Sequence, residues 1–398
     1  MLFFIQEAVY YKHNGKIYSD RISYDVYWDR YLEYFDSINV IARVKEVDNL
    51  DGNYHIAEGE KVNFIPLPFY NGFFGYLTSR GKIREILISH LTDKGTYVLR
   101  VPGPLGFTLS NLLYKNKLNY IAEVVGDPYE VIKHLRIFKP IKLLMMKRAQ
   151  LKMRSCVKNA SGVLYVTKNK LQQLYPKAKT AFSAAASNVI IKDEDVKIRN
   201  QQNVKNSIKE RLYNKSLEPI KIGVLGMLYP IKSPLEIVEA INLLIKDGMN
   251  IELLFAGDGP LKTQIIQLAE MNSIKNNVSC LGKITNVNEF LDNIDLYVQF
   301  SKTEGIPRAL LEAMSRGCLT VSSNVGGIAE ILPSNFLISS IDPQELYVKI
   351  KLLLSDEDLI SNNLENNYTI AKQNTVSELN KIRSEFYKQV YDLYYKNN

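Results

Sequence analysis

Short apolar runs alternate with helical patterns along most of this 398-residue chain, and that alternation limits the possible folds more than any other feature. Most runs are continuously apolar, which is typical of parallel strands buried on both faces. The predicted strands of the first half are 1–6, 38–44, 85–89, 97–101, 120–125 and 162–166. Helical patterns at 25–35 and 141–158 lie between them. A strand–helix alternation of this kind predicts a doubly wound α/β domain.

A second strand–helix series follows the polar segment 198–218, which we interpret as a boundary. Its predicted strands are 219–225, 251–256, 278–281, 296–300 and 319–322, and its predicted helices include 234–246 and 260–272. An amphipathic helix rich in Tyr and Phe closes the chain, and we expect it to pack on the first domain. The predicted domains are therefore 1–205, 206–374 and the returning helix 375–398. Two Rossmann-like domains that face each other across a cleft bind ligands beyond the carboxyl ends of their strands.

Composition is that of an ordinary globular protein, with 46% hydrophobic and 23% charged residues. Cys156, Cys280 and Cys318 are scattered and form no CxxC pair, which favours a reducing compartment and argues against structural zinc. The N-terminal stretch MLFFIQEAVYYK has no positive charge ahead of its apolar run, so it is a poor signal peptide. No stretch of about 20 apolar residues predicts a membrane span. These features predict a cytoplasmic location.

The net charge of +8 is unevenly distributed. Residues 131–192 contain 14 Lys and Arg and no Asp or Glu, so the rest of the chain, with 36 basic and 42 acidic residues, carries −6. A local field of this size attracts a polyanion such as nucleic acid, an anionic membrane or a phosphorylated lipid. The alternative is a solvated helix surface with no ligand.

The stretch EGIPRALLEAMSRG at 304–317 carries the most specific chemistry. Pro307 suits a first helical position and Gly317 the position just past a helix end, so we predict a helix there. Free N–H groups at its start would bind an anion such as phosphate. Glu304 before the helix and Glu312 inside it would accept hydrogen bonds from sugar hydroxyls. The alternative is that Glu304 caps the helix and Glu312 pairs with Arg308 or Arg316.

Four further glycine turns follow predicted strands, where ligand-binding loops of an α/β domain lie. They occur in VLGMLYPIKSP at 224–234, LFAGDGP at 254–260, CLGKI at 280–284 and TVSSNVGGIAEIL at 320–332. One glycine turn is weak evidence, but five in register around one edge of a sheet indicate a phosphate-containing ligand. A nucleoside diphosphate that carries a sugar fits both glutamates and the predicted anion site.

In this order the motifs resemble the nucleotide-binding half of retaining glycosyltransferases of family 4, which have the two-domain GT-B fold. The resemblance is close over about residues 220–335. The first domain matches in layout only, most clearly in NASGVLYVTKNKLQQLYP at 159–176. The resemblance implies that a nucleoside-diphosphate sugar, with UDP or GDP left open, is the donor and that no cofactor is obligatory. It also implies that Glu304 lies by the donor sugar and that Glu312 binds the ribose.

The resemblance assigns the remaining donor-site residues. Lys232 would neutralise the diphosphate, and with Glu304 it is a candidate catalytic residue. Met227 replaces an arginine that the family usually has, and we expect Arg308 to supply the missing charge because a bidentate cation is hard to replace. The other residues implied in nucleotide-sugar binding are Gly15, Gly226, Gly257, Gly259 and Ile306.

Asp127 is the third candidate catalytic residue, because it follows a predicted strand about where the family has a histidine near the sugar. Its alternative role is that of a turn residue before Pro128. The strings at 193–195 and 356–358 contain D-x-D but follow no strand, so we predict that both are solvated and that no metal is required.

The basic segment and the loop after strand 97–101 predict the acceptor side. The candidate acceptor or membrane residues are Arg100, Lys142, Lys147, Arg148, Lys152 and Arg154. A saccharide linked to a polyprenyl diphosphate at the inner face of an anionic cell membrane fits this charge, as in bacterial surface-polysaccharide assembly. Nucleic acid is disfavoured because the segment has no aromatic ladder. Two alternatives stay open: a non-catalytic scaffold of a glycan assembly complex, suggested by Met227, and a nucleotide-sugar epimerase.

Overall fold

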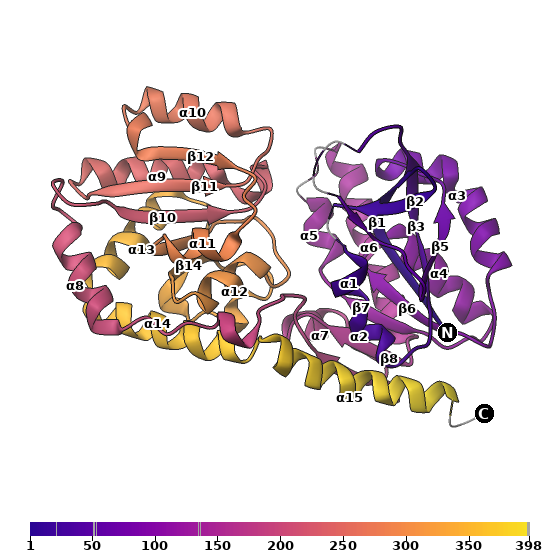
Figure 1. Ribbon diagram of the computed structural model, residues 1–398. Helices are drawn as coiled ribbons and strands as arrows, with labels where there is room; N and C mark the ends of the chain where they lie inside the picture. Colours follow the sequence, from indigo (N-terminus) through magenta and orange to yellow (C-terminus); the bar gives the residue numbers. More distant parts are fainter. Residues whose placement is uncertain (21, 51, 53, 134, 136, 396–398) are drawn as a thin grey trace. The chain divides into compact units, whose positions relative to one another are not determined.

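The structure is a computed structural model, and it describes residues 1–20, 22–50, 52, 54–133, 135 and 137–395. The chain forms two compact units (Figure 1). The first consists of Met1–Ala186 together with Asn380–Asn398, and the second of Ser187–Leu379. Each unit is built on its own sheet, and each sheet is covered by helices.

The first unit contains a parallel sheet whose strands run β5-β3-β1-β6-β7-β8-β9 in space. Their bounds are β1 Leu2–His13, β3 Ile38–Glu46, β5 Val62–Leu67, β6 Thr96–Val101, β7 Ile121–Val124, β8 Gly162–Tyr165 and β9 Phe182–Ala185. The far end of β1 also pairs with the antiparallel strand β2, Lys16–Ser19, which pairs with β4, His55–Ile56. The order of the parallel strands reverses at β1, as in a doubly wound fold.

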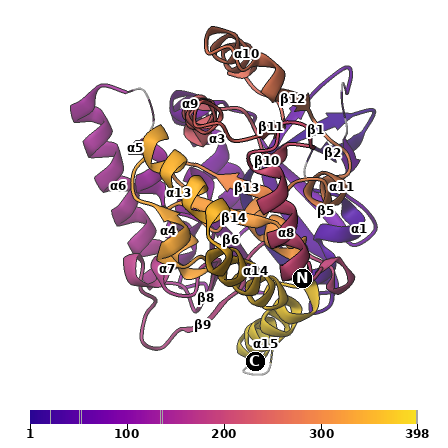
Figure 2. The same cartoon turned by 90° about the vertical axis from the view of Figure 1, so that its left-hand side faces the viewer.

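Helices connect these strands. They are α1 Tyr24–Tyr27, α2 Asp29–Leu32, α3 Gly72–Ser89, α4 Pro104–Lys115, α5 Pro128–Lys133, α6 Lys139–Lys158 and α7 Lys170–Leu174. Helix α4 is the most buried of them, with Leu105, Leu109 and Leu113 inside the core. Helix α6 runs along the outer side of this unit (Figure 2).

The second unit contains a six-stranded parallel sheet with the order β12-β11-β10-β13-β14-β15. The strands are β10 Ile220–Leu225, β11 Ile251–Ala256, β12 Val278–Gly282, β13 Leu296–Gln299, β14 Leu319–Ser323 and β15 Leu337–Ile338. The helices are α8 Gln201–Arg211, α9 Pro234–Lys246, α10 Lys262–Met271, α11 Val287–Asp292, α12 Arg308–Ser315, α13 Pro343–Ser355 and α14 Glu357–Lys372. The order reverses between β10 and β13, so this sheet is also doubly wound, as the sequence predicts.

Helix α15, Val376–Tyr395, ends the described chain, and its residues from Asn380 belong to the first unit. The hydroxyls of Tyr387 and Tyr31 both donate to Oε1 of Glu123, the buried carboxylate of β7. Arg100 lies 3.8 Å from the other oxygen of Glu123. The Tyr387 ring also packs on Tyr31, 5.4 Å between centroids. A buried charge is stable only when it is paired and hydrogen-bonded, so this cluster ties α15 to the first sheet.

Two sequence predictions for the first unit are wrong. The apolar run 85–89 is the last part of α3 rather than a strand, and Ile83 and Leu87 of α3 face the core one helical turn apart. A short apolar run does not by itself separate a strand from a buried helix turn. The pattern at 25–35 forms the two short helices α1 and α2 instead of one helix.

The segment 187–205, which the sequence analysis placed in the first domain, lies in the second unit. Arg199 anchors it by donating to the backbone oxygens of Arg316, Ile294 and Leu291, at 3.0, 2.9 and 3.0 Å. The polar stretch 198–218 forms α8 for much of its length rather than an open linker. The three hydrogen bonds of Arg199 therefore hold this segment in the second unit, although the polar composition of 198–218 had suggested that the domain boundary lies there.

No helix among the described residues is both long and apolar enough to cross a membrane.

Buried asparagines of α14 complete the hydrogen bonding of β14. Asn363 accepts from the Thr320 N–H at 2.8 Å and donates to the Thr320 oxygen at 2.9 Å. Asn367 donates to the Cys318 oxygen at 2.9 Å. The two amides act as a partial strand partner where β15 is too short to pair.

We predict that Asn363→Ala lowers the free energy of unfolding of the second unit by about 2–4 kcal/mol, because two buried backbone groups lose their partners. Chemical denaturation, monitored by far-UV circular dichroism, measures this loss. Asn362→Ala, at an exposed position of the same helix, is the matched control. Equal stability of the two variants would contradict the strand-partner role.

Candidate functional site

Backbone hydrogen bonds join the loops at the carboxyl edge of the second sheet into one continuous rim. The links, from β12 to the loop after β14, are Gly257 N to Gly282 O at 2.7 Å, Leu228 N to Asp258 O at 3.0 Å, Lys302 N to Ile231 O at 2.8 Å and Gly327 N to Gly305 O at 2.7 Å. The five glycine motifs therefore meet at one edge. This confirms that the motifs lie in register.

Glycine is required at several points of this rim because backbones approach closely. A Cβ on Gly257 would lie 1.9 Å from the Gly226 oxygen, and one on Gly326 would lie 1.9 Å from the Glu304 oxygen. A Cβ on Gly259 would lie 2.7 Å from the Leu228 oxygen. Gly226 itself has a φ of 142°. Side chains at these positions would push the loops apart.

Lys232 and Glu304 form an ion pair on this rim, from loops that follow the adjacent strands β10 and β13. Gln299, the last residue of β13, donates from Nε2 to the same oxygen of Glu304 at 2.8 Å. The Lys232 side chain is 32% exposed and the Glu304 side chain 13%. The pair lies where the strand order reverses, which is where doubly wound folds bind ligands.

Buried groups behind the ion pair fix its orientation. The Tyr297 hydroxyl donates to Oε1 of Gln299 at 2.7 Å, so the Gln299 amide must present its N–H groups to Glu304. Burial, with Glu304 and Glu312 nearby, raises the pKa of Tyr297 well above its ordinary value. Ser301 N donates to Ser323 Oγ at 3.0 Å and links β13 to β14. Sequence reasoning missed these residues, although the polar letters Gln299 and Ser301 in a buried strand end were a signal.

Helix α12 begins at Arg308, one residue after the prediction, with Pro307 extended at φ −71° and ψ 120°. Pro307 lacks an N–H and ends the loop without interrupting any helical hydrogen bond. No side chain caps the helix, so its first N–H groups are not used within it. Gly317 follows the helix at φ 68°, as the sequence predicts. Ile306 lies partly buried in the loop before the helix, and Arg308 is exposed.

Glu312 is partly buried inside α12, and burial raises its pKa, while Arg308 opposes that shift. The alternative ion pair with Arg316 does not form, because Arg316 binds Asp292 at 2.6 Å and Asp195 at 3.4 Å. The capping alternative for Glu304 also fails, because its carboxylate binds Lys232 and Gln299. Arg316 is thus engaged elsewhere, whereas Arg308 acts on Glu312 through its charge, and the part of either glutamate in donor binding stays a prediction.

A small hollow beside the ion pair is lined by both adjacent loops. Its lining includes Gly226, Met227, Leu228, Lys232, Gln299 and Ser301. Met227, which replaces the expected arginine, is 53% exposed. The side chain at 227 is therefore directed outward, where a longer cationic side chain would not be blocked by the core.

The candidates Asp127 and Gly15 belong to the first unit, and their contacts are described within that unit. Asp127 accepts from the Tyr175 hydroxyl and from Tyr129 N at 2.8 Å, so it stabilises the turn after β7. Gly15, at φ 77°, forms the turn of the β1–β2 hairpin and not a strand-to-helix loop. The predicted roles of Asp127 in catalysis and of Gly15 in nucleotide-sugar binding stay predictions.

Arg100 is a correction to the predicted acceptor surface. It belongs to the internal Glu123 cluster and donates to the Tyr27 hydroxyl at 2.6 Å. Lys142 bonds the backbone oxygens of Lys133 and Leu135 and so joins α5 to α6. Lys147, Arg148, Lys152 and Arg154 are exposed on α6.

Four of the six residues of the acidic strings are exposed and none is buried, as predicted, and several of the acids also have partners at the surface. Asp195 pairs with Arg316, Asp193 accepts from the Ser377 hydroxyl at 2.6 Å, and Asp356 caps α14. Within the described part of the chain, no group of three or more His, Cys, Asp or Glu side chains is placed to hold a metal ion.

Comparison with known proteins agrees with this architecture. Residues 206–373 match the family described as glycosyl transferases group 1. Protein CapJ of Staphylococcus aureus is 33% identical over 405 residues, which cover 97% of each chain. Capsular polysaccharide biosynthesis glycosyltransferase CapH of Staphylococcus aureus is 28% identical over 166 residues, which cover 39% of this chain and 45% of CapH.

A solved structure of Anabaena Alr3699/HepE in complex with UDP and glucose superposes on this chain with a TM-score of 0.64, at 14% identity and 98% coverage of each chain. The two doubly wound units thus form the GT-B fold. The chain belongs to the group 1 glycosyltransferases and is a transferase.

Glu312 yields a pH-dependent prediction. A carboxyl whose pKa is raised in the folded state destabilises that state when ionised, and the penalty disappears as the pH falls through the raised pKa. We predict that Glu312→Gln stabilises the ligand-free protein at neutral pH, and that this gain falls as the pH drops through the raised pKa and is gone below the ordinary value of 4.5. Thermal unfolding across this pH range measures the effect. Glu239→Gln, exposed on α9, is the control. A gain that does not depend on pH would contradict the burial argument.

Proposed function

We propose that this enzyme transfers a sugar, with retention of configuration, from a nucleoside-diphosphate sugar to a lipid-linked saccharide during synthesis of a bacterial surface polysaccharide. The observation that carries the proposal is the Lys232–Glu304 pair at the strand-order reversal, beside the uncapped start of α12. Its residues match the family 4 resemblance at the positions that bind the donor. The second unit would hold the donor, and the first unit would hold the acceptor.

The chemistry follows from the charges on the rim. As the bond to the sugar breaks, negative charge develops on the leaving diphosphate, and Lys232 together with the N–H groups of α12 would stabilise it. Glu304 would then accept from hydroxyls of the donor sugar. Glu312 would accept hydrogen bonds from the ribose hydroxyls. Its raised pKa is consistent with such a role, because carboxyl groups with shifted pKa values are common at functional sites. Each step uses the enzyme's own residues, and no metal is invoked.

Retention rests on the resemblance and on the placement of the carboxylates. Glu304 and Glu312 lie on one loop and the helix that follows it, so they would not flank a sugar from two sides as a glycosidase pair does. The anomeric configuration of the product, measured by nuclear magnetic resonance, tests this part of the proposal. An inverted product would overturn it.

Surface polysaccharide is supported by the relatives. CapH is a capsular polysaccharide biosynthesis glycosyltransferase by name, and CapJ matches nearly the whole chain. The HepE complex contains UDP, and for this chain the choice between UDP and GDP stays open. A polyprenyl-diphosphate carrier and a location on the inner face of the cell membrane would suit the basic first unit.

A donor screen tests the function directly. We expect release of nucleoside diphosphate from one member of a panel of UDP-, GDP- and ADP-sugars when a polyprenyl-diphosphate-linked sugar is present. Glu304→Gln should lower this rate about 100-fold or more, because it removes a negative charge next to the donor sugar, where charge develops as the bond to the diphosphate breaks. Glu239→Gln should leave the rate unchanged. Interconversion of a nucleotide sugar without acceptor would point to an epimerase instead, and no turnover by the folded protein would overturn the proposal.

Met227→Arg tests the missing cation. An arginine at this exposed position would reach the diphosphate beside Lys232, and we predict about tenfold tighter binding of the nucleoside diphosphate released in the screen. Isothermal titration calorimetry measures the affinity. Tyr229→Arg adds the same charge at another exposed position of the loop and is the matched control. An equal gain in affinity for the nucleoside diphosphate in both variants would show that the added positive charge acts at long range and not through a contact from position 227.

A further inference from the structure

Helix α6 carries apolar side chains on two opposite sides. Met146 and Met153, seven residues apart, are buried in the core of the first unit. Leu144 and Leu151, also seven residues apart, are 52% and 64% exposed, and Ile141 is 53% exposed. At 3.6 residues per turn these three residues follow one line along the outer side of the helix. Burial in the unit therefore explains the methionines but not the leucines.

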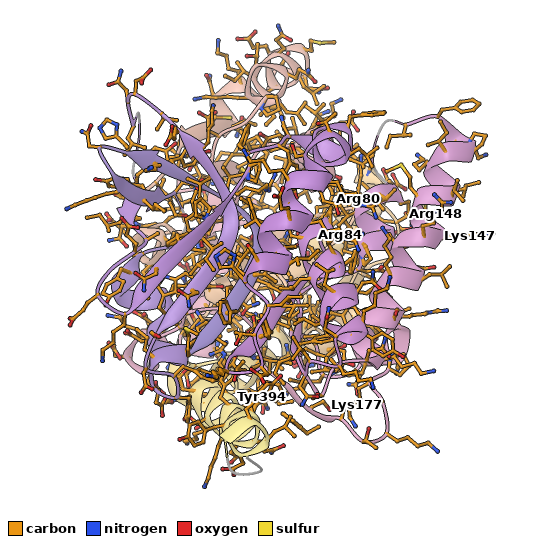
Figure 3. The ribbon with its side chains drawn as sticks, turned by 90° about the vertical axis from the view of Figure 1, so that its right-hand side faces the viewer. Arg80, Arg84, Lys147, Arg148, Lys177 and Tyr394 are labelled. Carbon is orange, nitrogen blue, oxygen red and sulfur yellow. The ribbon has the colours of Figure 1, made fainter. Side chains whose placement is uncertain are left out.

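Cations flank the exposed apolar line. Lys147 and Arg148 lie between Leu144 and Leu151 along α6, and Arg80 and Arg84 are exposed on α3. Figure 3 shows these four side chains gathered on one side of the first unit. The α3–α6 face is defined here as Leu144, Lys147, Arg148 and Leu151 with Arg80 and Arg84. Helix α6 contains no Asp or Glu, and the one carboxylate of α3 is Glu85, next to Arg84.

The cations of this region repel one another. Burial lowers the pKa of Lys152 from its ordinary value, and the charges of Arg80 and Arg148 lower it further. Arg80 and Arg148 therefore act on one ammonium from two different helices. Like charges held together in a folded protein are stabilised by an external anion, and several lipid phosphates in a plane would supply it.

We propose that the α3–α6 face binds an anionic lipid bilayer, with Leu144 and Leu151 in the boundary between headgroups and acyl chains and the cations on lipid phosphates. This inference deepens the membrane location in the proposed function and rests on it for the acceptor, but vesicle binding itself needs no donor. It adds α3 to a surface for which the sequence analysis had named Arg100 and cations of α6.

The apolar line favours a bilayer over other polyanions. A nucleic acid or a soluble polyphosphate would neutralise the cations but would leave Leu144 and Leu151 in water. A bilayer interface accepts both kinds of side chain, and lysine and arginine extend to the phosphates while leucine enters the apolar layer. Helix α6 is already folded and held by its buried methionines, so binding would not require the helix to form.

Co-sedimentation of the full chain with phosphatidylcholine vesicles, with and without phosphatidylglycerol, tests the inference. We expect binding only to the anionic vesicles. Lys147→Glu combined with Arg148→Glu should weaken the partition coefficient by roughly tenfold or more, since each cation near such a surface contributes favourably. Leu144→Ser combined with Leu151→Ser should weaken it about tenfold and leave the remaining binding more sensitive to salt.

The matched control is Lys246→Glu combined with Met271→Ser, which makes the same kinds of change at exposed positions of the second unit and should leave binding unchanged. Vesicle binding that neither α6 double variant weakens would overturn the inference. So would binding to duplex DNA at the same salt without binding to vesicles. If the protein binds vesicles but turns over no nucleotide sugar, the proposed function fails while this inference stands.

Discussion

The hydrogen-bonded rim of the second sheet is the constraint on which the proposed donor site depends. Lys232 and Glu304 are 72 residues apart in the chain, and they meet because β10 and β13 are neighbours and the loops after them are joined through Ile231 and Lys302. Glycines let these backbones approach to distances that no side chain allows. Under the proposed function, phosphate would bind at an edge whose loops are already hydrogen-bonded to one another without a ligand, so little ordering would be left for the binding step.

Buried polar groups show two different patterns in this protein. The Glu123 cluster, the asparagines of α14 and Arg199 are well paired, and each fixes the position of one segment on a sheet. Glu312 differs, because burial disfavours its charge and the nearby charge of Arg308 offsets only part of that effect. A group kept in an unfavourable state at the edge of a ligand site is a sign of function rather than stability.

Composition indicates where the positive charge lies along the chain, and only the structure shows which of these residues are exposed. Residues 131–192 lack acids, a pattern that favours an anionic partner but also fits a solvated helix surface. The phase of α6 then decides which residues can meet that partner: Met146 turns inward, while Leu144 turns outward. The structure also removes Arg100 from the candidate surface, because strand β6 points it at Glu123, and it brings in α3, whose cations are far away in sequence.

The sequence by itself determined the doubly wound class of both units and the glycine turns at the strand ends, and it singled out the two glutamates of the proposed donor site, because these depend on local periodicity and on short motifs. Tertiary structure alone decided the rest. Whether 85–89 formed a strand depended on what Ile83 and Leu87 packed against, and the place of 187–205 depended on carbonyl groups that Arg199 meets about a hundred residues later. Gln299 gained its role only when Tyr297 fixed its amide and Glu304 came within reach. Such long-range partners are set by strand order and packing, which no local pattern encodes.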